Sequence, residues 1–263
     1  MNKIGIIYFS GTGNTKFVSK NIKTELERYR KEVKLINIEK DIINPNDYES
    51  LIIGGPIYVE RYPDILLEYV EKYLGEYQGN CMLFTTQGAK RESFAFQHFM
   101  NRFPFINIRY CMYIPMPNNF YNFMFEMSSK EEEKQLIKES EVLIKKEIKD
   151  FFNGKIKVYP KNNFNVTMVD KIYKIFYNYY TRFLTKKINI DINKCNNCKL
   201  CEKSCPVNCI KIEENANFNK NCILCQRCMS HCPNKAFLYK NKSFIQYNPN
   251  FKEFSETLND KIE

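Results

Sequence analysis

Apolar residues along the first half of the chain follow two kinds of pattern. Short, nearly continuous apolar runs stand at KIGIIYF (3–9), VKLINI (33–38), SLIIGG (50–55) and CMLFTTQG (81–88). Between them, apolar residues recur at helical spacing, as at Phe17, Val18, Ile22 and Leu26. Apolar strands separated by helices are typical of a parallel sheet that is covered on both faces. The pattern therefore predicts an α/β fold, with helices over 14–30 and around 65–74.

A further helix closes this region. We predict that it begins at Ser128 or Ser129, carries the acidic residues 131–133 in its first turn and ends at Gly154. Serine favours the N-cap, acidic side chains complement the helix dipole, and glycine favours the C-terminal end. The chain is therefore divided into four parts: a first domain at 1–154, a connecting helix at 155–187, a cysteine-rich domain at 188–245 and a polar tail at 246–263.

The segment 166–187 has apolar or aromatic residues on most faces of a helix, interrupted by Lys171, Lys174 and Arg182. The favoured interpretation is a connecting helix packed between two domains. A helix on a membrane surface and a helix that binds a partner protein both stay open.

The composition narrows the class of protein. No run approaches the roughly 18 apolar residues of a membrane span, and the N-terminus lacks the small-residue cleavage site of a secretory signal. We therefore expect a cytoplasmic protein without a membrane span. Eleven cysteines in a reducing compartment indicate metal or cluster ligation rather than disulfides. The formal net charge of +10 would ordinarily favour binding to nucleic acid or membranes. The net charge of the complete protein also depends on the charge of whatever the cysteines bind.

The cysteines form one internal repeat. The pattern C-x2-C-x2-C-x3-C-P occurs at Cys195, Cys198, Cys201, Cys205 and Pro206, and again at Cys222, Cys225, Cys228, Cys232 and Pro233. Zinc sites normally use paired C-x2-C knuckles, so zinc is the weaker interpretation. Both runs resemble bacterial-type ferredoxins, in which the fourth cysteine of each run serves the other cluster.

That resemblance implies two [4Fe-4S] clusters with crossed ligands. The first cluster takes Cys195, Cys198, Cys201 and Cys232, and the second takes Cys222, Cys225, Cys228 and Cys205. The remaining cysteines, Cys81, Cys111 and Cys209, are interpreted as structural, because a free cysteine behaves as a small hydrophobic residue.

A glycine-rich turn follows the first apolar run, at Ser10-Gly-Thr-Gly-Asn-Thr15. A strand that enters such a turn and continues as a helix directs backbone N–H groups at an anion. The P-loop pattern is absent, and the dinucleotide fingerprint fails because Lys16 stands in place of its third glycine. The turn resembles the phosphate loop of flavodoxins, which bind FMN.

The resemblance to flavodoxins implies a doubly wound parallel five-stranded sheet, with the ligand outside the carboxyl ends of the strands. It assigns Ser10, Gly11, Thr12, Gly13, Asn14 and Thr15 to the FMN phosphate. Two further strand ends are expected at the flavin ring: Pro56, Ile57 and Tyr58 after the third strand, and Thr85, Thr86, Gln87 and Gly88 after the fourth. Tyr58 or Tyr62 is expected to stack on the ring, since the chain has no tryptophan.

Taken over nearly its whole length, the chain resembles the flavodoxin–ferredoxin fusions of anaerobic bacteria, a group of iron–sulfur flavoproteins. The resemblance implies an electron carrier that passes electrons between two [4Fe-4S] clusters and FMN, linking a low-potential reductant to an acceptor protein. Two clusters remove about four positive charges and a flavin phosphate about two. The small residual charge favours an acidic redox partner over nucleic acid.

Two other functions stay open: an FMN-dependent reductase of a small molecule that the clusters supply with electrons, and a redox-sensing binding protein. No catalytic residue is predicted. The segment 115–129 is interpreted as a lid, a partner surface or an edge-covering loop. Arg61, Lys90 and Arg91 are expected to attract the charge of reduced flavin.

Overall fold

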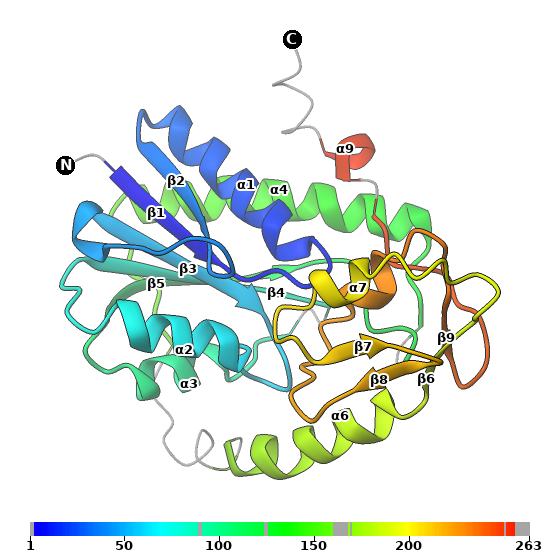
Figure 1. Ribbon diagram of the computed structural model, residues 1–263. Helices are drawn as coiled ribbons and strands as arrows, with labels where there is room; N and C mark the ends of the chain where they lie inside the picture. The colour runs from blue at the N-terminus through cyan, green and yellow to red at the C-terminus, as the bar shows by residue number, and fades with distance from the viewer. Residues whose placement is uncertain are drawn as a thin grey trace. The chain divides into compact units, whose positions relative to one another are not determined.

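The computed structural model describes residues 3–88, 91–123, 126–159, 168, 170–249 and 251–255. The chain divides into two compact units (Figure 1). The first unit contains Met1–Asn118, Ser128–Val169 and Asn250–Glu263, and the second contains Asn119–Met127 and Asp170–Pro249. The chain therefore passes between the units several times. The four domain boundaries drawn from the sequence stay predictions.

The first unit is built on a five-stranded parallel sheet in the order β2-β1-β3-β4-β5. Its strands are β1 (Lys3–Tyr8), β2 (Glu32–Asn37), β3 (Ser50–Pro56), β4 (Asn80–Gln87) and β5 (Asn107–Pro115). The central strand residues Ile6, Ile52 and Leu83 are fully buried, as the continuous apolar runs require. The order matches the flavodoxin-like doubly wound topology, so the predicted fold is confirmed.

Helices cover both faces of this sheet. The helical elements of the first unit are α1 (Asn14–Arg28), η1 (Pro45–Asp47), α2 (Asp64–Tyr73), α3 (Ala95–Arg102), α4 (Lys130–Phe152) and α9 (Phe251–Phe254). Figure 1 shows α1 and α4 on one face of the sheet and α2 and α3 on the other. Apolar side chains of α1 and α4, such as Val18, Ile22 and Ile144, pack into one core with the strands.

The start and end of α4 follow the predicted signals. Ser129 is the N-cap: its hydroxyl accepts a hydrogen bond from the Glu132 amide at 3.1 Å, and the Glu132 carboxylate accepts one from the Ser129 amide at 2.7 Å. This reciprocal pair is a capping box. Gly154 follows the helix with φ of 76°, a left-handed conformation that glycine adopts without strain.

Residues 251–255 belong to the core of the first unit. Phe251 stacks on Phe17 of α1 with ring centroids 4.6 Å apart, and Phe254 is buried in the cluster that α1 and α4 share. Ser255 donates a hydrogen bond to Glu141 of α4. The end of the described chain is therefore packed against two helices that lie more than one hundred residues earlier in the sequence.

The second unit contains two small antiparallel sheets. β6 (Ile188–Ile190) pairs with β9 (Phe237–Tyr239), and β7 (Ile210–Ile212) pairs with β8 (Ala216–Phe218). The helical elements are η2 (Tyr173–Tyr177), α6 (Asn178–Thr185), α7 (Leu200–Lys203) and α8 (Arg227–Ser230). Ile188, Ile210, Met229 and Phe237 form its core. The predicted small second domain with its own fold is confirmed.

Part of the segment 115–129 packs within this second unit. The Gln226 amide donates to the Asn119 carbonyl at 2.8 Å, and the Tyr121 hydroxyl donates to the Ile245 carbonyl at 2.6 Å. The ring of Phe123 meets that of Tyr239 edge-on, with centroids 4.9 Å apart. Residues 124 and 125 lie outside the described part of the chain. Residues 119–123 thus extend the second unit's core, although the chain has just left β5.

Over the residues that the structure describes, no helix combines the length and the apolar character that crossing a bilayer would require.

Candidate cofactor sites

The loop between β1 and α1 has the geometry of an anion site. Gly13 is the N-cap of α1, with φ of 116°, and contributes no side chain to the cap. The Ser10 hydroxyl accepts a hydrogen bond from the Lys16 amide at 3.2 Å, which folds the loop back over the first turn of the helix. The N-terminus of a helix attracts anions through its amides and its dipole. This loop therefore fits the phosphate of FMN.

Contacts with neighbouring segments fix the same loop. Asn14 donates from its side-chain amide to the Pro117 carbonyl at 3.1 Å. The hydroxyl of Thr15 lies 2.8 Å from that of Thr86, and both are buried. A Cβ added at Gly13 would lie 3.3 Å from the ring of Phe251. The Asn14, Thr15 and Thr86 side chains thus connect the predicted phosphate loop with the carboxyl ends of β4 and β5.

The loop after β3 depends on small residues. A Cβ at Gly54 would lie 2.0 Å from the ring of Phe84, so only glycine fits between these strands. Tyr62 is fully buried: its hydroxyl donates to the Phe84 carbonyl at 2.8 Å, and its ring packs edge-on against Phe99. The expectation that Tyr62 could stack on the flavin is therefore wrong, because this side chain fills the core. Tyr58 is half-buried and stays the candidate.

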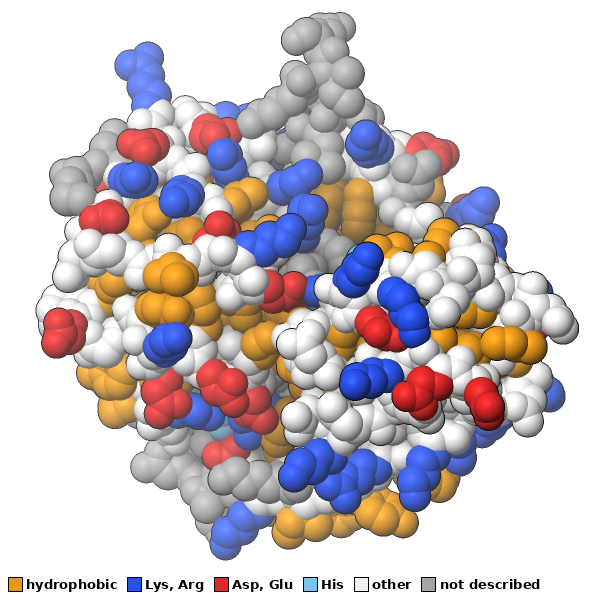
Figure 2. Space-filling view, in the orientation of Figure 1, with side chains coloured by type: hydrophobic (Ala, Val, Ile, Leu, Met, Phe, Trp, Pro, Cys, Tyr) orange, Lys and Arg blue, Asp and Glu red, His pale blue; other side chains and the backbone are white. Residues whose placement is uncertain are grey.

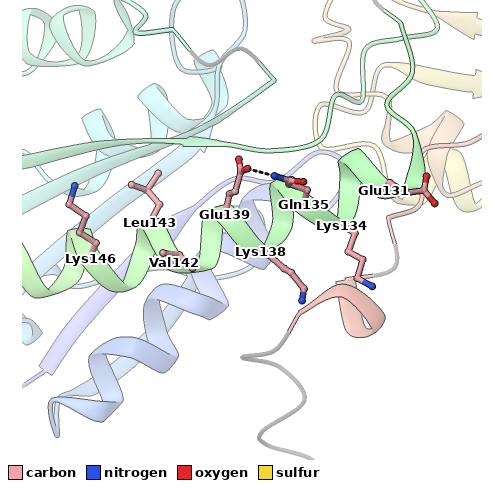
Figure 3. A pocket seen from close by; sticks show the side chains of 8 residues that line it. All are labelled: Glu131, Lys134, Gln135, Lys138, Glu139, Val142, Leu143 and Lys146. Atoms are coloured by element: carbon pink, nitrogen blue, oxygen red, sulfur yellow. Dashed lines mark hydrogen bonds between the residues drawn. The ribbon is translucent and has the colours of Figure 1, made fainter.

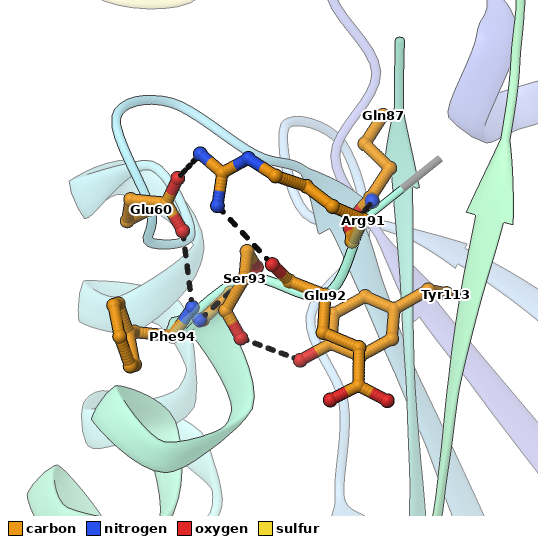
Figure 4. Close-up of polar contacts among 8 residues, drawn as sticks. Glu60, Gln87, Arg91, Glu92, Ser93, Phe94 and Tyr113 are labelled. Carbon is orange, nitrogen blue, oxygen red and sulfur yellow. Dashed lines mark hydrogen bonds and ion pairs between the residues drawn. The ribbon is translucent and has the colours of Figure 1, made fainter. Parts of the chain in front are cut away.

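An ion pair joins the loop after β3 to the loop after β4 (Figure 4). The Arg91 guanidinium pairs with Glu60, whose other oxygen accepts a hydrogen bond from the Phe94 amide at 3.1 Å. Gln87 donates to the Arg91 carbonyl at 2.5 Å. Val59 and Glu60 both have positive φ, of 49° and 64°, which directs Glu60 toward this contact.

These contacts change the expected electrostatics of the site. Arg61 is buried and forms an ion pair with Asp64, and Arg91 faces Glu60. Each of these two arginines therefore has a neighbouring carboxylate, which reduces its net field at the flavin, and their attraction for reduced flavin stays a prediction. Lys90, the third residue in that expectation, lies outside the described residues.

The remaining predicted ring residues stand at the end of β4. Thr85 is buried and donates to the Gln87 side-chain oxygen at 3.3 Å, and Gly88 is exposed beside Asn118. The Ile57 amide donates to the Thr86 carbonyl at 3.2 Å, which brings the loop after β3 to the end of β4. The predicted residues after β1, β3 and β4 therefore gather at one edge of the sheet. Glycines, hydroxyls and backbone amides at this edge fit a phosphorylated flavin.

A separate hollow lies on the first unit, away from the predicted FMN loops. It is a groove of about 600 Å³ along α4, lined by Glu131, Lys134, Gln135, Lys138, Glu139, Val142, Leu143 and Lys146 (Figure 3). All of these residues come from one helix, and Gln135 and Glu139 hydrogen-bond to each other at 2.9 Å. The groove is an open, mixed-charge helix surface, and none of the predicted FMN-binding residues lines it.

The second unit brings the first predicted ligand set together. Cys195, Cys198, Cys201 and Cys232 all line one small cavity, together with Ile190, Ile212 and Phe237. The first three come from one cysteine run and the fourth comes from the other, as the crossed arrangement predicts. Apolar and polar residues share the wall of this cavity, and Cys198 is exposed. The apolar part is suited to a cluster, because local burial tunes its potential.

The second set lies around Cys205. Burial raises the pKa of the Cys225 thiol to about 12 and raises that of Cys228 well above its ordinary value. Hydrogen bonds with Cys209 instead lower the pKa of Cys205 to about 5 and lower that of Cys222, so the four thiols of this set lie in unequal surroundings. Cys209, predicted to be structural, is buried, with its sulfur 3.5 Å from that of Cys205.

The backbone of the two cysteine runs repeats in detail. Residues with left-handed φ occur in matching pairs 27 positions apart: Asn197 and Leu224, Lys199 and Gln226, and Asn208 and Lys235. The Cys209 amide donates to the Cys205 sulfur at 3.3 Å, and the Ala236 amide donates to the Cys232 sulfur at 3.4 Å. Left-handed non-glycine residues cost about 1–3 kcal/mol each and cluster at ligand clamps. The repeated strain therefore fits two loops shaped around similar ligands.

Among the described residues, no group of three or more His, Cys, Asp or Glu side chains converges as the ligands of a single metal ion would.

Some contacts at these sites were not foreseen from the sequence. Glu60 and Phe251 each lie far along the chain from the residues that they contact, so no local pattern marks them. The signal for Phe251 was the pair of phenylalanines at 251 and 254, at helical spacing in a largely polar tail.

Family comparisons find two domains in this chain. Residues 5–103 match the flavodoxin domain, and residues 194–250 match the 4Fe-4S dicluster domain. An uncharacterised protein of Methanocaldococcus jannaschii is 39% identical over 74 residues, which are 28% of this chain and 27% of that protein. This match therefore spans about a quarter of the relative's length.

Several solved structures overlap with part of the chain. A flavoprotein from Lactobacillus acidophilus, in complex with FMN, is 17% identical with a TM-score of 0.38 and covers 43% of this chain and 93% of its own. A flavodoxin from the domain Archaea is 13% identical with a TM-score of 0.39. The match covers 56% of this chain and 99% of that flavodoxin. The two-electron reduced flavodoxin of Megasphaera elsdenii is 19% identical with a TM-score of 0.37. The match covers 42% of this chain and 84% of that flavodoxin.

The sheet order, the cysteine repeat and the matched domains together define a protein with a flavodoxin-like part and a part that matches the 4Fe-4S dicluster domain. The flavodoxin domain comes first and the 4Fe-4S dicluster domain follows, as the resemblance to flavodoxin–ferredoxin fusions predicted.

Proposed function

We propose that this chain is a cytoplasmic electron-transfer protein that passes electrons between two [4Fe-4S] clusters and FMN. It links a low-potential reductant to an acceptor protein, and an acidic surface on that acceptor fits the residual positive charge. The observation that carries the proposal is the presence, on one chain, of a flavodoxin domain and a doubled C-x2-C-x2-C-x3-C-P run. Clusters supply single electrons, and flavin holds one or two.

The chain's own residues have separate tasks in this scheme. Ser10, Gly11, Thr12, Gly13, Asn14 and Thr15 bind the phosphate, and the segments Pro56–Tyr58 and Thr85–Gly88 hold the ring. The eight cysteines of the repeat hold the irons. Ile190, Ile212 and Phe237 supply the apolar part of the surroundings of the first of the two cysteine sets. The ion pair of Glu60 with Arg91 ties the two ring loops together.

The test is a purification of the whole protein without oxygen, followed by assays of iron, sulfide and FMN. We expect about eight irons, about eight sulfides and about one FMN per chain. Rapid mixing with a strong one-electron reductant should bleach the cluster absorbance and the flavin absorbance in linked phases. Zinc in place of iron, or a protein that binds no FMN, would overturn the proposal.

The same preparation distinguishes the electron carrier from the two other candidate functions. An FMN-dependent reductase would reoxidise on adding a small substrate without any partner protein. A redox-sensing binding protein would contain clusters and little or no flavin. An electron carrier would reoxidise only when a second redox protein is added.

A further inference from the structure

The helical segment of residues 168–187 has two apolar faces. Tyr173, Tyr177 and Leu184 are buried in the second unit, and the Tyr177 hydroxyl donates to the Ile223 carbonyl at 2.6 Å. The other face carries apolar side chains that are exposed: Met168, Ile172, Ile175, Phe176, Tyr179 and Phe183. The exposed fraction reaches 74% at Tyr179, 68% at Ile175 and 64% at Phe176. The buried face already packs the helix into the second unit, so that packing does not account for the exposed apolar face.

The exposed residues form one continuous strip. Their spacing follows the three- and four-residue steps that place side chains on one face of a helix. Within the second unit the strip runs from Ile172 through η2 to Phe183 of α6. Isolated exposed apolar residues are ordinary, whereas contiguous patches mark interaction surfaces. This strip is of the second kind.

Basic residues accompany the strip. The segment 168–187 contains Lys171, Lys174, Arg182, Lys186 and Lys187 against the single acidic residue Asp170. The Lys187 ammonium lies 3.5 Å from the centre of the Phe183 ring, so a cation sits directly over an exposed aromatic side chain. At the lower edge of Figure 2, where α6 runs in Figure 1, hydrophobic side chains lie beside lysines and arginines.

We propose that this strip, residues 168–187, binds the surface of a membrane that contains anionic phospholipids. The helix would lie in the interfacial plane, with Ile175, Phe176 and Tyr179 among the acyl chains. Lys171, Arg182, Lys186 and Lys187 would lie at the headgroups. Helices with aromatic residues on one face and Lys or Arg beside them bind bilayers in this way. The strip is a convex single-helix surface, which suits a deformable bilayer. The inference is independent of the proposed electron transfer.

The experiment uses the full-length holoprotein and vesicles that float on a density gradient. Vesicles of phosphatidylcholine alone are compared with vesicles that also contain phosphatidylglycerol. We expect the protein to float with the anionic vesicles, and less protein to float as salt is added. The double substitution Phe176→Ser with Tyr179→Ser should weaken binding at least tenfold. The double substitution Lys186→Gln with Lys187→Gln should weaken it and reduce its dependence on salt.

A matched control lies on the first unit. Val142 of α4 is 67% exposed, and Val142→Ser should leave vesicle binding unchanged. All variants should keep the cluster and flavin absorbance of the wild type, since the substituted side chains are exposed. The proposal is overturned if no vesicle binds, or if the strip variants bind as the wild type does. It is also overturned if light scattering shows a dimer that Phe176→Ser converts to a monomer, because the strip would then bind a second copy.

Discussion

The hydroxyls of Thr15 and Thr86 lie 2.8 Å apart, and both side chains are buried. Thr15 stands in the first turn of α1 and Thr86 near the carboxyl end of β4, with β3 between β1 and β4 in the sheet. This hydrogen bond therefore spans the crevice in which doubly wound folds bind their ligands. It joins the predicted phosphate loop to a loop predicted to contact the flavin ring.

Replacing Thr86 by Val should weaken FMN binding about tenfold. The change keeps the shape of the side chain but leaves the buried Thr15 hydroxyl without this partner, a loss on the order of 1–3 kcal/mol. The dissociation constant can be measured from the quenching of FMN fluorescence by protein depleted of flavin. Thr24→Val, at another buried threonine of α1, is the control and should bind FMN normally. Equal affinity in the two variants would show that the threonine pair does not shape the site.

Replacing Glu60 by Gln should raise the midpoint potential of the bound flavin, on the order of 30 mV, which is a tenfold change for two electrons. The Arg91 charge then lacks its carboxylate and attracts the negative charge of the reduced flavin. Arg91→Gln with Glu60→Gln should return the potential toward the wild-type value. Glu68→Gln, at an exposed position of α2, is the control: it removes the same charge and should leave the flavin potential unchanged. A fall in potential in the Glu60 variant would contradict this account.

Replacing Cys209 by Ala should lower the potential of one cluster and leave the other unchanged. The Cys209 sulfur lies 3.5 Å from that of Cys205, a contact that Ala236, its counterpart in the repeat, cannot make. A donor to a ligand sulfur stabilises the reduced, more negative cluster, so its loss should shift the potential down by roughly 50 mV. A redox titration followed by electron paramagnetic resonance resolves the two clusters. Equal shifts in both clusters would rule out this local effect.

Cys81 and Cys111 should resist alkylation in the folded protein at pH 9. Burial raises the pKa of each thiol to about 12, and only the thiolate reacts. The folded pKa lies above the unfolded value, so burial of these thiols stabilises the fold below about pH 9, and this contribution is lost as the pH rises toward 12. Iodoacetamide labelling and mass spectrometry, with and without denaturant, measure this directly. Rapid labelling of either cysteine in the native protein would show that it is not buried.

Much of the architecture could be predicted from the sequence. The runs around Ile6, Ile52 and Leu83 predicted a buried parallel sheet, because a strand covered on both faces has no polar side. Ser129 was one of two predicted N-caps, and it forms the capping box. The cavity lined by Cys195, Cys198, Cys201 and Cys232 also matches the set implied by the resemblance to ferredoxins.

Other features could not be predicted from local patterns. The sequence suggested that Tyr62 could stack on the flavin ring, whereas its hydroxyl donates a hydrogen bond to the Phe84 carbonyl in the core. Arg91 was expected to act on the flavin through its charge, and nothing in the sequence indicated that Glu60 of another loop would pair with it. The segment 115–129 gave no sign that Phe123 would pack against Tyr239. Each of these outcomes depends on a contact between residues far apart in the chain.

The sequence by itself determined the strands, the helix ends, the glycine-rich turn and the spacing of the cysteines, because these depend on period, backbone freedom and short loops. Tertiary structure alone decided which aromatic residue is core, which charges are balanced and where Phe251 lies. Burial and ion pairing belong to neighbours in space, and a linear pattern of residues does not specify those neighbours.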